Sequence, residues 1–148
     1  MKRSPILLLL PLLPLMAGCD GQVLGVDKTY HYQGFDEAGN VLVVGTLHLE
    51  YGHSGDSRYP VEIRGTWNFE QHLDGEHHLG PQIGKGDLEG SMRPDGQFWI
   101  GLNPGVADNN VNLTGHFVGG RYGDFEGDWA YSTLFGVAGQ GRFEATRR

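Results

Sequence analysis

Glycine recurs so closely along this chain that a long helix has almost no room. Beyond residue 27, no stretch without glycine exceeds nine residues. Each glycine inside a helix costs roughly 1 kcal/mol relative to alanine, and a typical helix runs to about 11–12 residues. The spacing therefore argues against a helical fold and favours strands and turns.

Apolar residues in the body of the chain alternate with polar ones. Val61, Ile63, Trp67 and Phe69 share one parity and Gly65 lies in the same series, whereas the residues between them are polar. A period of two indicates strands with one buried and one wet face. The same pattern recurs at residues 111–117 and 125–131, and at residues 135–143, where it places Phe135, Val137, Gly139, Gly141 and Phe143 on the buried face. Strands are predicted at about 28–34, 41–51, 59–71, 83–92, 96–102, 110–119, 122–131 and 134–146.

Tight-turn sequences separate several of these segments. Residues 38–40 read Ala-Gly-Asn, residues 94–96 read Pro-Asp-Gly, and residues 119–120 are a glycine pair. Short turns join antiparallel neighbours, because parallel strands need long crossovers. The predicted fold is thus all-β, an antiparallel up-and-down meander of about eight strands.

A repeated unit favours closure of this meander into a small β-barrel. Glycine precedes a large apolar residue by two positions in five places, which are Gly45–Leu47, Gly65–Trp67, Gly115–Phe117, Gly127–Trp129 and Gly141–Phe143. A glycine inside a strand permits the sharp bend that a small barrel needs, and an aromatic ring on the next strand can cover it. A β-sandwich is the alternative architecture.

The first eighteen residues have the pattern of a targeting segment. Lys2 and Arg3 precede an apolar run from residue 6 to residue 16, and small residues end at Gly18. The run is too short to span a bilayer, which takes about 20 residues in a helix. This order of charge, apolar run and small residues is typical of a cleaved signal peptide.

Cys19, the only cysteine, follows directly, and residues 15–19 read Leu-Met-Ala-Gly-Cys. This stretch resembles the lipobox of bacterial lipoproteins, a resemblance that implies cleavage before Cys19 and lipidation of that residue. It implies a cell-envelope location, anchored in a membrane and facing the periplasm, where Asp20 favours the inner over the outer membrane. An ordinary secretory signal with a chance cysteine is the alternative.

These readings divide the chain into three parts. Residues 1–18 are a lipoprotein signal peptide, residues 19–27 the lipidated cysteine and a spacer, and residues 28–148 the β-barrel domain. Loss of Lys2 and Arg3 would change the formal net charge from −7 to −9. Such an acidic body does not suit nucleic acid, whose phosphates need a basic surface.

The Gly-x-Trp units at residues 65–67 and 127–129 resemble those of calycin-type barrels, the lipocalin and avidin families. The stretch from residue 113 to residue 129 is also similar to the barrel lobes of surface lipoproteins of the transferrin-binding protein B kind. The calycin resemblance implies a carrier of a small hydrophobic ligand. Inward-facing aromatics could line its cavity or could simply form a packed core; they are Trp67, Phe69, Phe117, Trp129, Tyr131 and Phe143.

One polar cluster is a candidate for metal capture. His72, Asp74, Glu76, His77 and His78 lie within seven residues, and imidazole and carboxylate groups suit zinc, copper or nickel. Their spacing matches no standard zinc signature, so a solvated loop is the alternative.

No catalytic motif accompanies these features. The chain has no Gly-x-Ser-x-Gly sequence for a nucleophile elbow and no phosphate-loop pattern. We therefore expect no enzyme activity and no cofactor. The expected function is that of a lipid-anchored envelope lipoprotein whose barrel binds an envelope protein, with ligand carriage and metal capture as alternatives.

Overall fold

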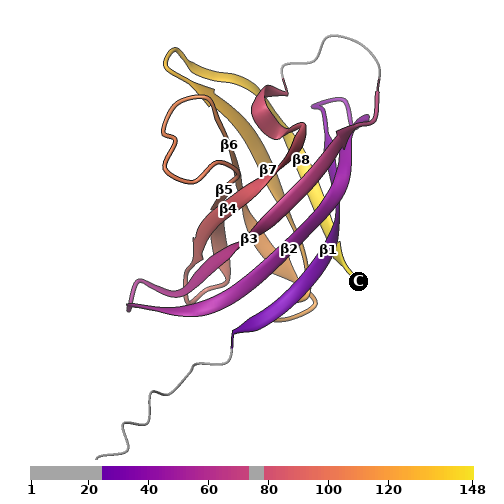
Figure 1. The fold of residues 1–148 in the computed structure, drawn as a ribbon. Helices are drawn as coiled ribbons and strands as arrows, with labels where there is room; N and C mark the ends of the chain where they lie inside the picture. The colour runs from indigo at the N-terminus through magenta and orange to yellow at the C-terminus, as the bar shows by residue number, and fades with distance from the viewer. Residues whose placement is uncertain (1–24, 74–78) are drawn as a thin grey trace, which may run out of the picture.

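In the computed structural model, which describes residues 25–73 and 79–148, the chain forms one closed antiparallel β-barrel (Figure 1). Consecutive strands pair in chain order and β1 pairs with β8 to close the wall. This result confirms the predicted meander and excludes the sandwich. The elements are β1 (Val26–Phe35), β2 (Val41–Asp56), β3 (Tyr59–Gln71), the 3₁₀ turn η1 (Gly80–Gln82), β4 (Gly84–Met92), β5 (Gln97–Gly101), β6 (Asn110–Val118), β7 (Asp124–Thr133) and β8 (Gly136–Arg147).

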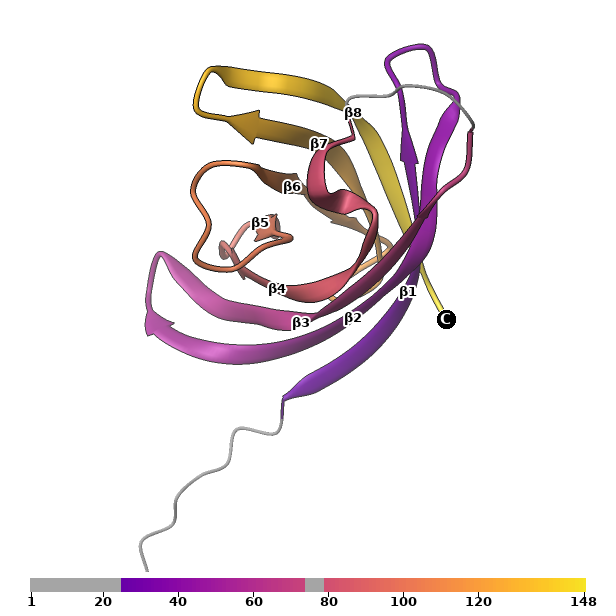
Figure 2. The same ribbon diagram turned by 45° about the horizontal axis from the view of Figure 1, so that its top comes forward.

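The up-and-down order gives the barrel two different ends. One end, here the entry end, holds the start of β1 at Val26, the turns after β2, β4 and β6, and the C-terminus (Figure 1). The opposite end, here the loop end, holds the β1–β2 turn, the β3–β4 connection, the β5–β6 loop and the β7–β8 turn. Figure 2 shows η1 lying across the loop end. Within the two described ranges, no helix has the length and apolar character needed to cross a bilayer.

The glycines of the repeated unit lie where neighbouring backbones approach each other closely. A Cβ atom added to Gly127 would lie 1.9 Å from the carbonyl oxygen of Thr114, and one added to Gly115 would lie 2.0 Å from that of Glu126. The equivalent distance is 2.2 Å or less at Gly45, Gly65, Gly90 and Gly141. Only glycine fits such approaches, so these positions allow the strands to bend into a narrow barrel.

Aromatic rings contact one another in the interior of the barrel. Tyr32 stacks between Phe69 and Phe143, with ring centroids 4.2 Å and 5.6 Å away. Phe125 contacts Phe143 and Phe98 edge-on, at 5.9 Å and 5.2 Å. Edge-on and offset contacts suit the ring quadrupole, and the resulting cluster joins opposite walls of the barrel.

The buried face predicted near the start of the last strand is wrong in part. Phe135 is fully exposed and Val137 is mostly exposed, although Phe143 is buried as expected. Leu134 and Phe135 form the two-residue turn between β7 and β8, which pair at Thr133 and Gly136. Tyr131 pairs with Gly139 and Ser132 with Val137, so Ala138 is an extra residue in β8. This β-bulge reverses the inward and outward alternation and turns Val137 to the outside.

Candidate functional site

The six aromatic residues proposed to line a cavity do not form one group. Trp67, Phe69, Trp129 and Phe143 are buried in the core, whereas Phe117 and Tyr131 are only partly buried against it. The Trp67 and Phe69 rings lie 5.3 Å apart, and the Tyr32 ring separates Phe69 from Phe143. Lining a ligand cavity remains a prediction for this set.

The polar atoms of the two buried tryptophans point at the backbone of the chain. The Trp67 Nε1–H donates to the Leu102 carbonyl at 2.7 Å, and the Trp129 Nε1–H donates to the Phe35 carbonyl at 2.8 Å. Each indole is therefore oriented by a structural hydrogen bond that spans two elements. These bonds secure the β5–β6 loop and the end of β1.

Two buried side chains inside the barrel have polar atoms without a partner among the described residues. They are the hydroxyl of Tyr32 and both side-chain polar atoms of Gln82, the last residue of η1. Burial raises the pKa of the Tyr32 phenol well above its usual range. An unsatisfied buried amide is costly, by about 1–3 kcal/mol. Sequence reasoning missed Gln82, because nothing in the residues around it marks it as buried.

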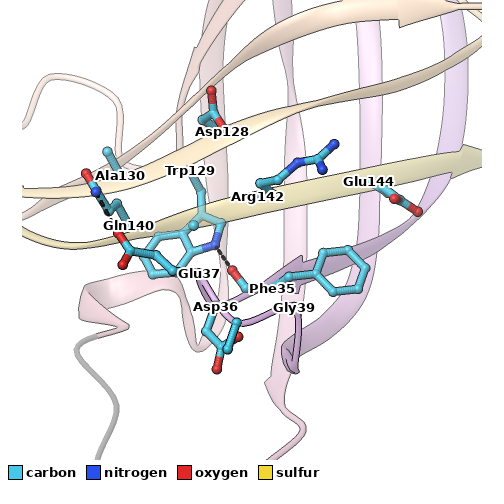
Figure 3. A pocket seen from close by; sticks show the side chains of 12 residues that line it. Phe35, Asp36, Glu37, Gly39, Asp128, Trp129, Ala130, Gln140, Arg142 and Glu144 are labelled. Atoms are coloured by element: carbon cyan, nitrogen blue, oxygen red, sulfur yellow. Dashed lines mark hydrogen bonds between the residues drawn. The ribbon is translucent and has the colours of Figure 1, made fainter.

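A groove of about 760 Å³ runs along the outside of the wall, between the β1–β2 turn and β8 (Figure 3). Asp36 and Glu37 line it on the turn side, and Gln140, Arg142 and Glu144 line it on β8. The Trp129 indole forms part of its floor, and its hydrogen bond to the Phe35 carbonyl fixes the point at which β1 leaves the wall (Figure 3).

The groove is acidic. Four carboxylates line it, from Asp36, Glu37, Asp128 and Glu144, against the single guanidinium of Arg142. Hydrogen bonds from the Asn40 side chain and backbone hold the pKa of Asp36 below its usual range. At neutral pH the groove therefore attracts cations.

A hydrogen bond between two side chains bridges the groove (Figure 3): the Gln140 Nε2–H donates to Glu37 Oε1 at 2.8 Å. Both side chains are exposed, so water competes for this bond and its net contribution to stability is about 1 kcal/mol or less. The sequence patterns did not predict this groove, because it is assembled from residues more than a hundred positions apart.

Exposed apolar side chains are concentrated at the loop end. Nine large hydrophobic residues are exposed in the described part of the chain, and six of them lie in the connections or at the strand ends of the loop end. They are Leu73, Ile83, Val106, Leu134, Phe135 and Val137. Leu134, Phe135 and Val137 are neighbours in one hairpin, and adjacent exposed apolar side chains commonly mark a surface that binds another molecule.

The metal cluster and the lipidation site are largely outside the described residues. Of the predicted metal ligands, only His72 is described, and its side chain is exposed; Asp74, Glu76, His77 and His78 lie outside that range, as does Cys19. Among the residues that the structure does describe, no three histidine, cysteine or acidic side chains are grouped to hold a metal ion.

Comparison with protein-family models, curated proteins and solved structures finds no match to this chain. The closed eight-stranded antiparallel barrel is compatible with a calycin-like barrel. That compatibility is one of architecture, and architecture does not determine function. The geometry of the barrel and its loops is the basis for a functional proposal.

Proposed function

We propose that this protein is a lipid-anchored cell-envelope lipoprotein whose barrel is a non-catalytic interaction module. The lipid on Cys19 tethers the chain to a membrane, and the loop end binds an envelope protein. The connection from Cys19 reaches the barrel at Val26, on the entry end. A tether there leaves the loop end free for a partner.

The observation that carries this proposal is the gathering of exposed apolar side chains at the loop end. Phe135 is fully exposed and Leu134 is mostly exposed, both in the two-residue β7–β8 turn. Burying one such ring against a partner contributes about 1.5–3 kcal/mol. An aromatic side chain at the tip of a projecting hairpin suits the role of an interface anchor.

Two labelling experiments in a bacterial host test this function. Radiolabelled palmitate is expected to enter the wild-type protein but not the Cys19→Ala variant. A photo-reactive amino acid at Phe135 is expected to give a discrete crosslinked adduct. The matched control is the same substitution at Val118, which is also exposed and apolar but lies at the entry end. Unlabelled wild-type protein, or equal crosslinking at both positions, would contradict the proposal.

Carriage of a small hydrophobic ligand is a second candidate, favoured by the unpartnered polar atoms of Tyr32 and Gln82 inside the barrel. A ligand with a polar head could satisfy these groups and place its apolar part among the rings. Native mass spectrometry and tryptophan quenching with a fatty-acid and haem panel test this function. No bound species and no quenching across the panel would exclude those ligands.

A further inference from the structure

We infer that the open edge of β8 binds an extended, cationic peptide segment of the partner, which adds to the barrel wall as an extra strand. This inference deepens the proposed function and rests on it. The edge in question is the stretch from Gly136 to Gly141, at the loop end of the barrel.

The barrel wall is closed along only part of β8. The pairing of β1 with β8 runs from Tyr30 and Arg147 to Phe35 and Arg142, and there β1 ends. On its other side, β8 continues to pair with β7 as far as Gly136. The segment from Gly136 to Gly141 therefore has a strand neighbour on one side only, among the residues that the structure describes.

The alternation along β8 shows which backbone groups face the open side. The Arg148 N–H donates to the Thr29 carbonyl of β1, and the β1–β8 register continues without a shift to Arg142. Successive residues of a strand direct their backbone groups to opposite neighbours. The N–H and C=O of Gln140 thus point toward the missing strand, where an added peptide could pair with them.

The space beside this edge fits an extended chain. The acidic groove adjoins a second hollow that shares Asp36, Glu37 and Gln140 with it and is also lined by Leu79 and Val137. The edge itself is mostly glycine and alanine, so side chains do not block a strand from approaching. Within the described ranges, the exposed bond between Gln140 and Glu37 is the side-chain hydrogen bond that must break. The bulge at Ala138 limits the length of regular strand along the open edge, so the edge can pair with only a short peptide segment.

Charge decides between a cationic partner and a second copy of this chain. The groove has four carboxylates and one guanidinium, and the chain carries a formal charge of −7. Pairing two copies at this edge would bring like charges together, whereas lysine or arginine side chains on a strand would face opposite charges. If basic and apolar residues alternate in the bound segment, its basic side chains all lie on one face of the added strand, where they can meet these carboxylates together.

The test uses fluorescence anisotropy with the purified full-length protein in detergent. The probe is a labelled octapeptide of alternating lysine and valine. A glutamate–valine peptide controls for charge, and a lysine–valine peptide N-methylated at alternate residues controls for backbone pairing. We expect binding of the first probe, weakened by salt, and at least about tenfold weaker binding of both controls.

Variants locate the bound peptide on the protein. Glu37→Lys and Glu144→Lys, each made alone, are expected to weaken binding by about threefold, whereas Glu50→Lys, an exposed change of the same charge on β2, should leave it unchanged. Gln140→Pro removes the open N–H and should abolish binding, whereas Gln140→Ala should retain it. If Gln140→Pro does not fold, the N-methylated peptide still tests backbone pairing.

Three results would overturn the inference. They are absence of binding by the lysine–valine peptide, equal binding of the N-methylated peptide, and equal weakening by Glu50→Lys. Self-association in sedimentation that Gln140→Pro abolishes would likewise overturn it, in favour of a second copy at this edge. If the edge fails these tests while palmitate labelling and Phe135 crosslinking succeed, the proposed function stands without it; if the labelling and crosslinking fail, the proposed function itself is wrong.

Discussion

Replacement of Gly127 by alanine tests the physical basis of the barrel. A Cβ atom at this position would lie 1.9 Å from the Thr114 carbonyl oxygen and 2.6 Å from the Gly115 Cα. A carbon and a carbonyl oxygen in ordinary contact are about 3.3 Å apart. The strands β6 and β7 must therefore move apart locally by more than about 1 Å, since both obstacles are backbone atoms.

The expected cost follows from this displacement. Overpacking of a tight site costs about 1–3 kcal/mol, and weakening one or two hydrogen bonds of the ladder adds about 1 kcal/mol. We expect the free energy of unfolding to fall by about 2–4 kcal/mol. For a domain of this size, about 4 °C of Tm per kcal/mol corresponds to a fall in Tm of about 8–16 °C.

Gly52→Ala is the matched control for this prediction. Gly52 also lies inside a strand, but a Cβ there would meet nothing within 4 Å. Alanine in that space should raise the free energy of unfolding by about 0.4–1 kcal/mol, because it reduces the freedom of the unfolded chain. Thermal and urea unfolding followed by far-ultraviolet circular dichroism measure both variants. The reasoning is refuted if the two substitutions change stability in the same direction, or if Gly127→Ala costs less than about 0.5 kcal/mol.

Three further predictions concern polar groups. Tyr32→Phe should raise the free energy of unfolding by about 1–2 kcal/mol, because it removes a buried hydroxyl without a described partner. Tyr30→Phe should lower the free energy of unfolding by about 1 kcal/mol, because the Tyr30 hydroxyl hydrogen-bonds that of Tyr51 at 2.9 Å. Urea unfolding measures both variants. Burial raises the pKa of the Tyr30 and Tyr51 phenols, so their contribution to the free energy of unfolding should be fully present below about pH 10 and be lost as the pH rises further. Absorbance at 295 nm reports ionisation of the phenols, and circular dichroism reports unfolding. Hydrogen bonds from Asn40 lower the pKa of Asp36, so the stabilisation that they give the folded protein is present above about pH 4 and is lost as the pH falls through the lowered value. Asn40→Ala should return the pKa of Asp36 toward its ordinary range, as an NMR titration would measure.

The fold could be predicted because its two main determinants are local. Alternation at Val61, Ile63, Trp67 and Phe69 identifies a strand and its buried face, and the structure places all four in the core. The regular offset of glycine from large residues predicted sharp strand bends and a closed barrel, and the barrel is closed. Both patterns depend on neighbours within a few positions, so they can be read without knowledge of the tertiary structure.

The misplaced face at Val137 shows where local patterns stop being informative. The bulge at Ala138 is a property of the pairing between β7 and β8, and no residue type in that stretch marks it. Counted back from the buried Phe143, one extra residue reverses the inward and outward assignment of the residues before it, such as Val137. Gln82 is a similar case, because its burial depends on η1 lying across the barrel end.

The candidate binding edge depends on the stagger between the first and last strands. The alternation of apolar and polar residues gives no information about that stagger. Closing a sheet into a barrel requires a shear in the register, and here the shear ends the β1 pairing at Arg142 while β7 follows β8 to Gly136. The same sequence with β1 paired further along β8 would have no open edge and no groove. Proteins commonly protect exposed edges with lysine or proline, and the stretch from Gly136 to Gly141 contains neither. An edge left without charge, opposite carboxylates on the neighbouring turn, is therefore better explained by a strand that binds there than by the needs of the barrel alone.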